Sequence, residues 1–426
     1  MNEVTQERRR FSTVLALALT GFALSGALAA CGSDDDKADG GASGTGGSTA
    51  QTTESEAVEV TPEEQSELLA AAFYTDEVEN PSPVLLKALK IGAAELTPEQ
   101  EDLLRECMEK TTCETGQGDL VLGIADSFGD IPWRVQARLE QTAQAIQSGK
   151  VAKIIYTNGH ADLQQSQSNF RSLIAQRVDI ISAYYDFASA MTSLFRQAQR
   201  QGVVVTSYIS NIPHGDGESD GIEFAADIEA VAHDMASAVQ EAHPEPGNAV
   251  LFTGVPGNPT AAVWQPVVTE DLEAAGWKIS FKGNTNWTPA GELSSASAAI
   301  AKGEPIDVIL YDGAGPVELM RAFERAGEDM PAVVSWGSGN TYFDLYEKLG
   351  APDDQYITNG QTWTGRVAVQ AAIDRASGEE VPGEIVLPQP LVQTTAAKPQ
   401  WEPTLRYGQA YLPPTFAGDI VTEFNK

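Results

Sequence analysis

From about residue 119 onward, short apolar runs alternate with amphipathic segments along the chain. The runs are rich in Val, Ile and Leu and are typical of buried strands, whereas the segments between them repeat apolar positions with a helical period. The first series of predicted strands is Leu120–Ala125, Ala152–Thr157, Val178–Ser182 and Val203–Tyr208, with predicted helices at Trp133–Ser148, Gln165–Gln176 and Ala188–Gln201. This alternation predicts a parallel sheet with helices on both faces.

A second series follows a segment rich in Gly, Pro and Asp at residues 211–220. Its predicted strands are Ala249–Thr253, Lys278–Phe281, Ile306–Tyr311, Ala332–Ser335 and Tyr356–Asn359, with helices at Thr260–Ala275, Ala290–Lys302, Val317–Ala326 and Thr341–Leu349. Two such series predict an α/β fold of two similar Rossmann-like lobes joined by a hinge. We expect the chain to cross between the lobes near 211–220, near Asn359–Gln361 and near Pro382–Glu384.

Residues 61–117 have a helical pattern and predict an N-terminal helical extension. Thr97 is placed as an N-cap, Pro98 as the first helical residue and Gln100 as the partner of a capping box, which predicts a helix to about Lys110. The segment is amphipathic and carries no recognisable chemistry. We expect it to pack against the lobes, with partner binding as the alternative.

Residues 1–30 are typical of an export signal, because the basic cluster Arg8–Arg10 precedes an apolar run from Phe11 to Ala30. The run ends in Leu28-Ala29-Ala30-Cys31, which resembles the lipobox of bacterial lipoproteins. We therefore expect a lipid on Cys31 and an extracytoplasmic protein anchored on the outer face of the bacterial cytoplasmic membrane. A transmembrane helix that ends at an incidental Cys is the alternative.

The remaining segments complete the expected organisation. Residues 31–60 are rich in Gly, Ser and Thr and predict a disordered tether. We expect the first lobe to comprise residues 118–211 plus 360–385 and the second lobe residues 212–359 plus 386–396, followed by a C-terminal tail at 397–426. No stretch after the signal is apolar for long enough to predict a membrane span.

Cys107 and Cys113 lie close together in the exported, disulfide-permissive part of the chain. A bond between them would close a small loop and stabilise the fold by roughly 2 kcal/mol on the chain-entropy model. Two unrelated free thiols are the alternative. A metal site is disfavoured because no further Cys or His lies nearby in the sequence.

The formal net charge of −33 excludes a nucleic-acid partner, whose phosphates need a basic patch. It also disfavours docking of the folded body on anionic lipid and suits a monomer that repels its copies. The tether carries only a small share of the acidic residues, so the acidity belongs to the folded body. This favours a neutral sugar or polyol over an anionic ligand.

In open α/β sheets, ligands bind beyond the carboxyl ends of the strands. Aromatic residues and side chains with two hydrogen-bonding atoms recur just after the predicted strands. Sugars need both, because their C–H faces stack on aromatic rings and their adjacent hydroxyls pair with bidentate groups. The candidate ligand-binding residues are Asp126, Ser127, Phe128, Asp130, Trp133, Tyr184, Asp186, Tyr208, Asn258, Trp264, Gln265, Tyr311, Asp312, Trp336, Asn359, Gln361 and Trp363.

Motifs of catalysis are absent from the sequence. It contains no complete GxGxxG, GxxxxGK[ST] or GxSxG pattern, and its four histidines form no HxxxH pair. We therefore expect no enzyme, no metal and no cofactor. A glycosidase that uses Asp126 and Asp312 as its carboxylate pair is the enzymatic alternative.

With the strand ends in order, residues 119–395 resemble the type 1 periplasmic-binding-protein family, in particular the ribose/xylose/galactose-binding proteins of ABC importers. In the first lobe the likeness rests on Gly123–Phe128 with Pro132-Trp133, on Asp162, Gln165, Leu173 and Val178-Asp179-Ile180, and on Ala198, Gly202 and Val203-Val204-Val205. In the second lobe it rests on Gly254–Asn258, on Tyr311-Asp312 before a helix that ends in Ala326-Gly327, and on Gln361 with Gly365.

The resemblance implies that hinge closure captures a sugar, which is then delivered to an ABC permease. Phe128 and Trp133 would flank the sugar ring, and Asp126, Ser127 or Asp130 would bind hydroxyls. Asp312 would occupy the place of the family's Asn-Asp pair, and Asn359 or Gln361 would lie near the last hinge crossing. A sensor of the same fold that signals to a membrane kinase is the alternative.

The sequence departs from the family pattern in three places. Residues 208–211 stand where the family often has Asp, Gln265 stands where it has Arg, and Ser335-Trp336-Gly337 replaces a Gly-aromatic-Asp motif. These changes remove charged partners for hydroxyl groups. They put ribose or galactose specificity in doubt and leave an aromatic-rich site for another sugar or polyol.

Overall fold

The structure, a computed structural model, describes residues 59–184, 186–208, 221–313, 315–351, 353, 355–400 and 418–424. The predicted signal, Cys31, most of the predicted tether and the 211–220 segment lie outside the described residues. In the described part of the chain, no helix is long and apolar enough to cross a membrane.

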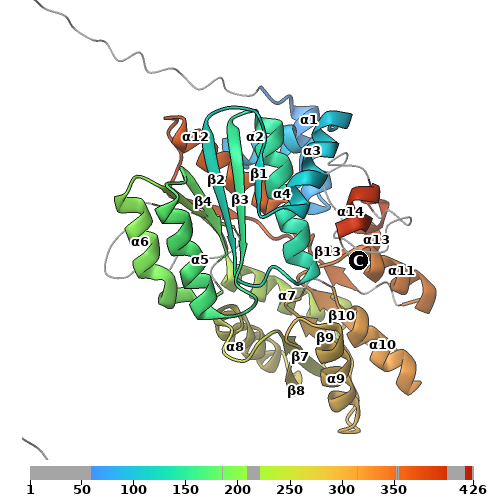
Figure 1. The fold of residues 1–426 in the computed structure, drawn as a ribbon. Helices are drawn as coiled ribbons and strands as arrows, with labels where there is room; N and C mark the ends of the chain where they lie inside the picture. Colours follow the sequence, from blue (N-terminus) through green and yellow to red (C-terminus); the bar gives the residue numbers. More distant parts are fainter. Residues whose placement is uncertain are drawn as a thin grey trace, which may run out of the picture. The chain divides into compact units, whose positions relative to one another are not determined.

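The first lobe is built on a five-stranded sheet with the strand order β1-β3-β2-β4-β5 (Figure 1). Its strands are β1 (Thr112–Glu114), β2 (Leu120–Asp126), β3 (Val151–Asn158), β4 (Ile180–Ala183) and β5 (Val204–Ser207), of which β2 to β5 are parallel. Its helices are α4 (Pro132–Ser148), α5 (Leu163–Ala175) and α6 (Thr192–Arg200), the last preceded by a 3-10 turn at Ala188–Met191. The first predicted series is therefore confirmed.

The second lobe is built on a six-stranded sheet with the order β13-β11-β10-β9-β7-β8. Its strands are β7 (Asn248–Thr253), β8 (Lys278–Asn284), β9 (Val308–Tyr311), β10 (Ala332–Ser335), β11 (Tyr356–Ile357) and the antiparallel β13 (Val392–Gln393). Its helices are α7 (Ile228–Ala242), α8 (Pro259–Ala274), α9 (Pro289–Ile300), α10 (Val317–Ala326) and α11 (Asn340–Leu349). The predicted α/β fold of two parallel-sheet lobes is confirmed, although the sequence analysis missed α7.

A two-stranded parallel sheet pairs β6 (Glu223–Ala226), which lies between the two halves in the sequence, with β12 (Glu384–Leu387), which follows α12. Phe224 and Leu387 are buried in the same core cluster as β2, α4 and α12 (Thr364–Ala376), so this sheet packs with the first lobe. The chain therefore leaves the first lobe after Leu387, because residues near Pro382–Glu384 are held by the pairing of β12 with β6.

The N-terminal helices α1 (Pro62–Phe73), α2 (Pro83–Ala93) and α3 (Pro98–Glu109) pack on the first lobe, against α4 and α12. The capping box predicted at Thr97 and Gln100 starts α3. One short part of this region is extended rather than helical, because β1 pairs antiparallel with β3 and so covers the edge of the first sheet. The predicted Cys107–Cys113 disulfide is present and joins α3 to β1.

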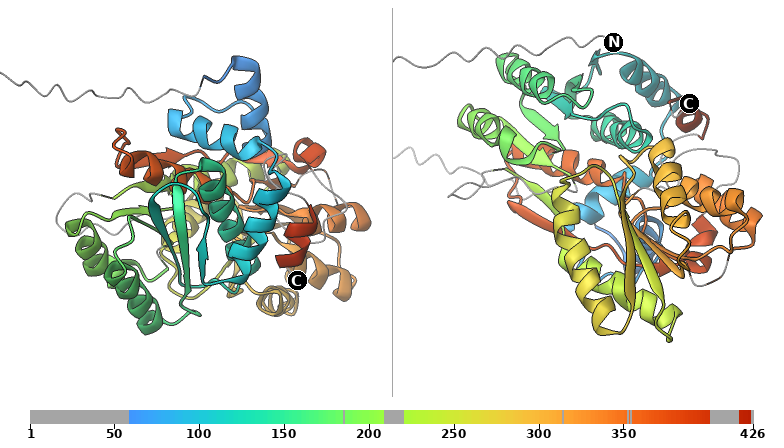
Figure 2. Two further views of the ribbon diagram at one scale, coloured as in Figure 1. Left: turned by 45° about the horizontal axis from the view of Figure 1, so that its top comes forward. Right: turned by 90° about the horizontal axis from the view of Figure 1, so that it is seen from below.

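The C-terminal part of the chain contacts both lobes. After β13, α13 (Thr394–Ala397) and a 3-10 turn at Lys398–Gln400 stay with the second lobe, where Ala397 is buried in the core. The last helix, α14 (Gly418–Phe424), contacts α4 (Figure 2). Its Ile420 and Val421 are buried in the core of the first lobe.

Candidate functional site

The parallel strands of the first lobe bring several of the predicted binding residues to one edge of the sheet. Asp126 ends β2, Tyr184 and Asp186 follow β4, and Tyr208 follows β5. Asp126 Oδ1 accepts the backbone N–H of Phe128 at 2.9 Å, which fixes the turn after the strand. These residues, together with Trp133, form what we call the first-lobe cluster.

Arg134, which the sequence analysis missed, lies at the centre of the first-lobe cluster. Its Nη2 donates to Asp186 Oδ1 at 2.6 Å, and its Nη1 lies 3.9 Å from Asp126 Oδ1. Its guanidinium carbon lies 3.4 Å from the ring centroid of Tyr184. The available signal was its position, because it directly follows Trp133 at the start of the predicted helix after the first strand.

Aromatic rings surround this ionic group. Trp133 stacks on Tyr208, with ring centroids 6.2 Å apart and an interplanar angle of 16°. Tyr184 meets both rings edge to face, at 5.9 Å and 5.5 Å. Trp133 Nε1 donates to the carbonyl of Gly360 at 2.7 Å, and this bond links the cluster to the connection between β11 and α12.

Four buried polar atoms of the first-lobe cluster have no hydrogen-bond partner among the described residues. They are Asp126 Oδ2, Arg134 Nη1, Asp186 Oδ2 and Tyr208 Oη. A buried polar atom without a partner costs about 1–3 kcal/mol, more when it is charged. The cluster therefore offers both donors and acceptors that a hydroxyl-rich ligand can satisfy.

Burial and mutual charge shift the pKa values of these groups. Burial raises the pKa of Asp186 to about 7, against the lowering effect of Arg134. The pKa of Asp126 is also raised by burial, with Arg134 again opposing the shift. Burial alone would lower the pKa of Arg134, but the charges of Asp186 and Asp126 raise it above its usual range. Arg134 therefore stays charged and is shared by two carboxyl groups.

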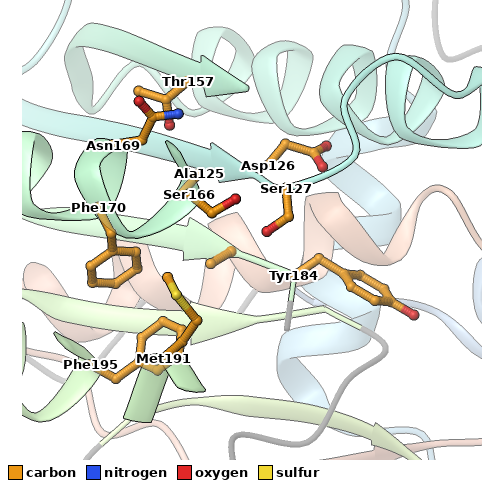
Figure 3. A pocket seen from close by; sticks show the side chains of 11 residues that line it. Ala125, Asp126, Ser127, Thr157, Ser166, Asn169, Phe170, Tyr184, Met191 and Phe195 are labelled. Atoms are coloured by element: carbon orange, nitrogen blue, oxygen red, sulfur yellow. The ribbon is translucent and has the colours of Figure 1, made fainter. Parts of the chain in front are cut away.

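A small pocket opens beside the cluster, at the carboxyl ends of β2, β3 and β4 (Figure 3). Asp126, Ser127 and Tyr184 line its polar side, and Phe170, Met191 and Phe195 line its apolar side. Phe170 and Phe195 pack edge to face, with ring centroids 4.7 Å apart. The pocket thus lies at the strand ends of the first lobe, and Asp126 and Ser127 are among the residues that line it.

In the second lobe, Asp312 follows β9 and accepts hydrogen bonds from three donors. Its Oδ2 accepts from the Thr253 hydroxyl at 2.5 Å and from Trp264 Nε1 at 2.9 Å, and its Oδ1 accepts from Trp287 Nε1 at 3.4 Å. Burial raises the pKa of Asp312 to about 6, against the lowering effect of these hydrogen bonds. The carboxylate thus holds two indole rings in fixed orientations at this strand end.

Trp287 is the second residue that the sequence analysis missed. The predicted strand stopped at Phe281, whereas β8 continues to Asn284 and Trp287 lies just beyond its end. The ring lies against Gly254, where a Cβ atom would come within 2.0 Å of Trp287 Cε2. Trp287 also has a positive φ of 49°, a conformation that the surrounding contacts must hold in place.

The first-lobe cluster and the Asp312 group interact electrostatically. Burial raises the pKa of Tyr184 to about 12, and among the smaller contributions is the negative charge of Asp312 in the second lobe. Both groups lie at the carboxyl ends of parallel strands, one in each lobe, and this is where open α/β sheets bind their ligands.

Several predicted residues lie beside these groups rather than in them. Phe128 packs its ring on Phe187 at 5.9 Å. The side chain of Asp130 is 65% exposed and pairs with His160 Nδ1 at 2.8 Å. Asn258 caps α8 and donates to Thr253 Oγ1 at 3.4 Å, next to Asp312.

Other predicted residues of the second lobe point elsewhere. The hydroxyl of Tyr311 donates to Glu292 Oε1 at 2.9 Å inside the second-lobe core. Trp336 packs on Trp264 at 6.2 Å and donates its N–H to the sulfur of Met235. Gln265 is half-buried on α8, next to Trp264.

The predicted residues near the second crossing are engaged within the hinge. Gln361 Nε2 donates to the carbonyl of Pro388 at 2.9 Å, so it joins two of the connections between the lobes. Asn359 Oδ1 accepts from Trp363 Nε1 at 3.2 Å. Trp363 is fully buried and packs on Phe73 of α1 in the first-lobe core.

The raised carboxyl pKa values predict that the protein is more stable at pH 5 than at pH 8. Asp186 and Glu292 have pKa values of about 7 and Asp312 of about 6, whereas an unfolded chain titrates these groups near 4. Between about pH 4 and pH 7 the folded chain binds more protons than the unfolded chain, so stability falls as pH rises through that window. Calorimetric unfolding midpoints at the two pH values measure the effect.

The control is Glu292→Gln, which removes one raised carboxyl group in the second-lobe core. Glu292 Oε1 and Oε2 accept from Tyr311 and from the backbone of Glu318, so the neutral amide keeps part of the network. The variant should depend less on pH than the wild type. If the stability of both proteins depended equally on pH, the raised pKa of Glu292 would be contradicted.

The geometry defines a class of protein: two α/β lobes, joined by several connections, with polar and aromatic groups at the strand ends of each lobe. The chain belongs to the periplasmic binding protein family, because the family model described as a periplasmic binding protein domain matches residues 123–380. This places it among binding proteins rather than enzymes. Among the described residues, no group of three or more His, Cys, Asp and Glu is placed to hold a metal ion.

Solved structures of similar fold agree with this assignment. The myo-inositol-binding protein of Caulobacter, bound to myo-inositol, is 20% identical with a TM-score of 0.58 and covers 66% of this chain and 95% of its own. A Mycobacterium smegmatis protein in complex with β-D-fucofuranose is 19% identical, with a TM-score of 0.57 and coverage of 66% and 93%. The fructose-binding periplasmic domain of a hybrid two-component system is 18% identical, with a TM-score of 0.57 and coverage of 66% and 92%. No protein with a curated description matches the chain in sequence.

Proposed function

We propose that this protein captures a neutral sugar or polyol between its lobes by hinge closure and delivers it to an ABC permease. The observation that carries the proposal is the set of four unpartnered polar atoms on Asp126, Arg134, Asp186 and Tyr208. Adjacent hydroxyl groups of a ligand would donate to the two carboxylates and accept from the guanidinium, which satisfies atoms that are otherwise buried at a cost.

Aromatic rings supply the other half of the recognition. Trp133, from the first lobe, and Trp287, from the second, are half-buried and lie beside the polar groups at the strand ends of their own lobes. Their faces suit the C–H faces of a sugar or cyclitol ring. The carboxyl groups of both lobes disfavour an anionic ligand because they would repel it.

The lobes are expected to close because the ligand would contact both of them. A ligand that touches both Asp126 and the Asp312 group is bound fully only when the lobes are together, so it shifts the population to the closed state. A permease that docks on both lobes would recognise that state. In this proposal the chain acts as a monomer held at the outer face of the membrane by a lipid on Cys31, which the sequence motif supports.

The test is a panel of neutral pentoses, hexoses and cyclitols added to the purified full chain, with thermal unfolding and tryptophan fluorescence as readouts. We expect at least one compound to raise the midpoint, because ligand at about 100 times Kd stabilises by about 2.7 kcal/mol. Tyr208→Phe removes one unpartnered hydroxyl and should weaken binding about 5–30-fold while the ligand-free protein stays as stable as the wild type.

The matched control is Asp130→Asn, because the Asp130 side chain is exposed and lies outside the cluster. It should leave the affinity unchanged. The proposal fails if no compound on the panel shifts either readout, or if the control weakens binding as much as Tyr208→Phe does.

A ligand sensor is the second candidate function. It is favoured by one observation, the likeness in fold to the periplasmic domain of a two-component system. Cross-linking of the full chain in its native membranes, followed by mass spectrometry, separates the two roles. Capture of a permease supports import, and capture of a sensor kinase with no permease supports signalling.

A further inference from the structure

Two consecutive residues at the end of α1 are buried in the cores of different lobes. Phe73 belongs to the first-lobe core, where its ring meets Trp363 edge to face at a centroid distance of 5.0 Å. Trp363 Nε1 donates to the carbonyl of Ala72 at 3.0 Å, which fixes the end of α1 against the connection between β11 and α12. Tyr74, the next residue, belongs to the second-lobe core.

Tyr74 is held in the second lobe by its hydroxyl and by its ring. The hydroxyl lies 2.7 Å from Ser338 Oγ, and Ser338 Oγ in turn donates to the carbonyl of Thr358 at 3.2 Å, so Tyr74 is the donor in this chain of bonds. The ring meets Phe343 of α11 edge to face at 6.4 Å. Tyr74 has a φ of 65°, a conformation that an L-residue adopts only where its surroundings hold it.

These contacts span a hinge. Helix α1 packs on α2, and α2 packs on α4 and α12 of the first lobe, so the body of the extension moves with that lobe. The Tyr74 side chain is anchored in the other lobe, next to the second connection. A rotation of one lobe against the other must therefore carry Tyr74 along or pull it out of its buried site.

We propose that Tyr74 is an interlobe clasp, through which the N-terminal extension holds the two lobes in the described arrangement and limits their opening. The clasp acts through the second-lobe core, because the hydroxyl and the ring of Tyr74 contact Ser338 and Phe343 there. It biases the lobes towards one arrangement, and its removal shifts the population to more open states. The proposal rests on the two-lobed fold and not on the identity of the ligand.

The C-terminal part of the chain supports this inference with a second tie between the lobes. Lys398 pairs with Glu347 of α11 in the second lobe. In α14, Glu423 pairs with Arg105 of α3 at 3.5 Å on the first lobe, where Ile420 is fully buried. Both ends of the folded chain thus contact both lobes.

The test is a distance measurement between spin labels on the two lobes of the ligand-free full chain. The labels replace Arg171 of α5 and Glu270 of α8, which are both exposed, in a background with Cys31→Ser. We expect Tyr74→Ala to lengthen and broaden the interlobe distance distribution. Tyr74→Phe and Ser338→Ala remove the same hydrogen bond, so we expect each to give a smaller shift and the double variant to add nothing.

The control is Tyr346→Phe, which changes a buried tyrosine of α11 whose hydroxyl bonds Asp353 within the second lobe. It should keep the wild-type distances. Circular dichroism checks folding, and if Tyr74→Ala fails to fold, Tyr74→Phe and Ser338→Ala decide the question. The clasp is overturned if the folded variants show the wild-type distribution, or if Tyr346→Phe shifts it equally.

Discussion

Replacing Arg134 by Met is expected to lower the free energy of unfolding by about 3–5 kcal/mol and to abolish ligand binding. The side chains of Arg134, Asp126 and Asp186 are only 5%, 1% and 9% exposed, and Arg134 is the cation that the two carboxyl groups share. Met keeps much of the side-chain length but leaves both carboxyl groups buried without a positive partner. A ligand would also lose the unpartnered Nη1 donor.

The sign of the pH effect makes this prediction specific. Without Arg134, both carboxyl groups are more easily protonated, so the loss of stability should be smaller at pH 5 than at pH 8. Denaturant unfolding at the two pH values measures it. A second change, Asp186→Asn, should restore part of the stability but not the binding.

The control for this pair of measurements is Arg171→Met, since Arg171 is exposed on α5. A surface change of this kind usually alters stability by no more than about 0.5 kcal/mol. If Arg134→Met lowers the free energy of unfolding at pH 8 no more than this control does, the central role assigned to Arg134 is contradicted.

The second large effect is expected at Arg366 of α12, which forms a fully buried ion pair with Glu140 of α4. Both side chains are completely buried, and Arg366 Nη1 also donates to Gln147 Oε1 at 2.6 Å and to Gln144 Oε1 at 3.3 Å. Arg366→Met should cost about 3–5 kcal/mol, because it leaves the Glu140 carboxylate buried without its partner. The ligand affinity of the folded fraction should stay unchanged, since this pair joins α4 to α12 in the interior of the first lobe.

A double variant distinguishes the loss of a partner from the loss of packing. Arg366→Met combined with Glu140→Leu replaces both charges by apolar groups and should recover most of the stability. Lys110→Met, which removes an exposed pair with Glu106, is the control and should cost at most about 0.5 kcal/mol. A double variant as unstable as the single one would show that packing, not the unpaired charge, causes the loss.

Helix α4 also shows what the N-terminal extension contributes. It carries polar side chains at positions that would face water if the first lobe ended at its own sheet and helices. Helices α2 and α3 pack on α4, where Gln147 Nε2 donates to the carbonyls of Ile91 and Ala94 and Arg138 Nη2 donates to the carbonyls of Cys107 and Lys110. The extension is therefore an integral part of the first lobe.

The elements of the fold followed from local patterns. The strand at Ala332–Ser335 and the helix at Val317–Ala326 were predicted with the bounds that the structure has, because apolar periodicity and capping residues act within a few positions of the chain. The position of Asp126 and Asp312 at strand ends followed too, since parallel strands bring their carboxyl ends to one edge. Short elements held by distant partners, such as β6 and β12, were not predicted.

The site itself could be predicted only in part. Trp133, Tyr184, Asp186 and Tyr208 were predicted and do lie together with Asp126, but the cation that they surround was missed. Tyr311 and Trp363 were expected at the site and instead pack in the interior, against Glu292 and Phe73. An aromatic residue after a strand has the same sequence pattern whether its ring faces a ligand or a core.

The sequence by itself determined the two-lobed α/β architecture, the strand ends that carry the site and the acidity of the folded body. Only the tertiary structure decided that Arg134 joins two carboxyl groups, that Trp287 shares Asp312 with Trp264, and that Tyr74 reaches across the hinge. The physical reason is the distance along the chain over which each kind of interaction acts. Periodicity and capping arise between near neighbours in the chain, whereas these contacts join residues that meet only when separate elements pack, and the direction of a side chain is fixed by that packing.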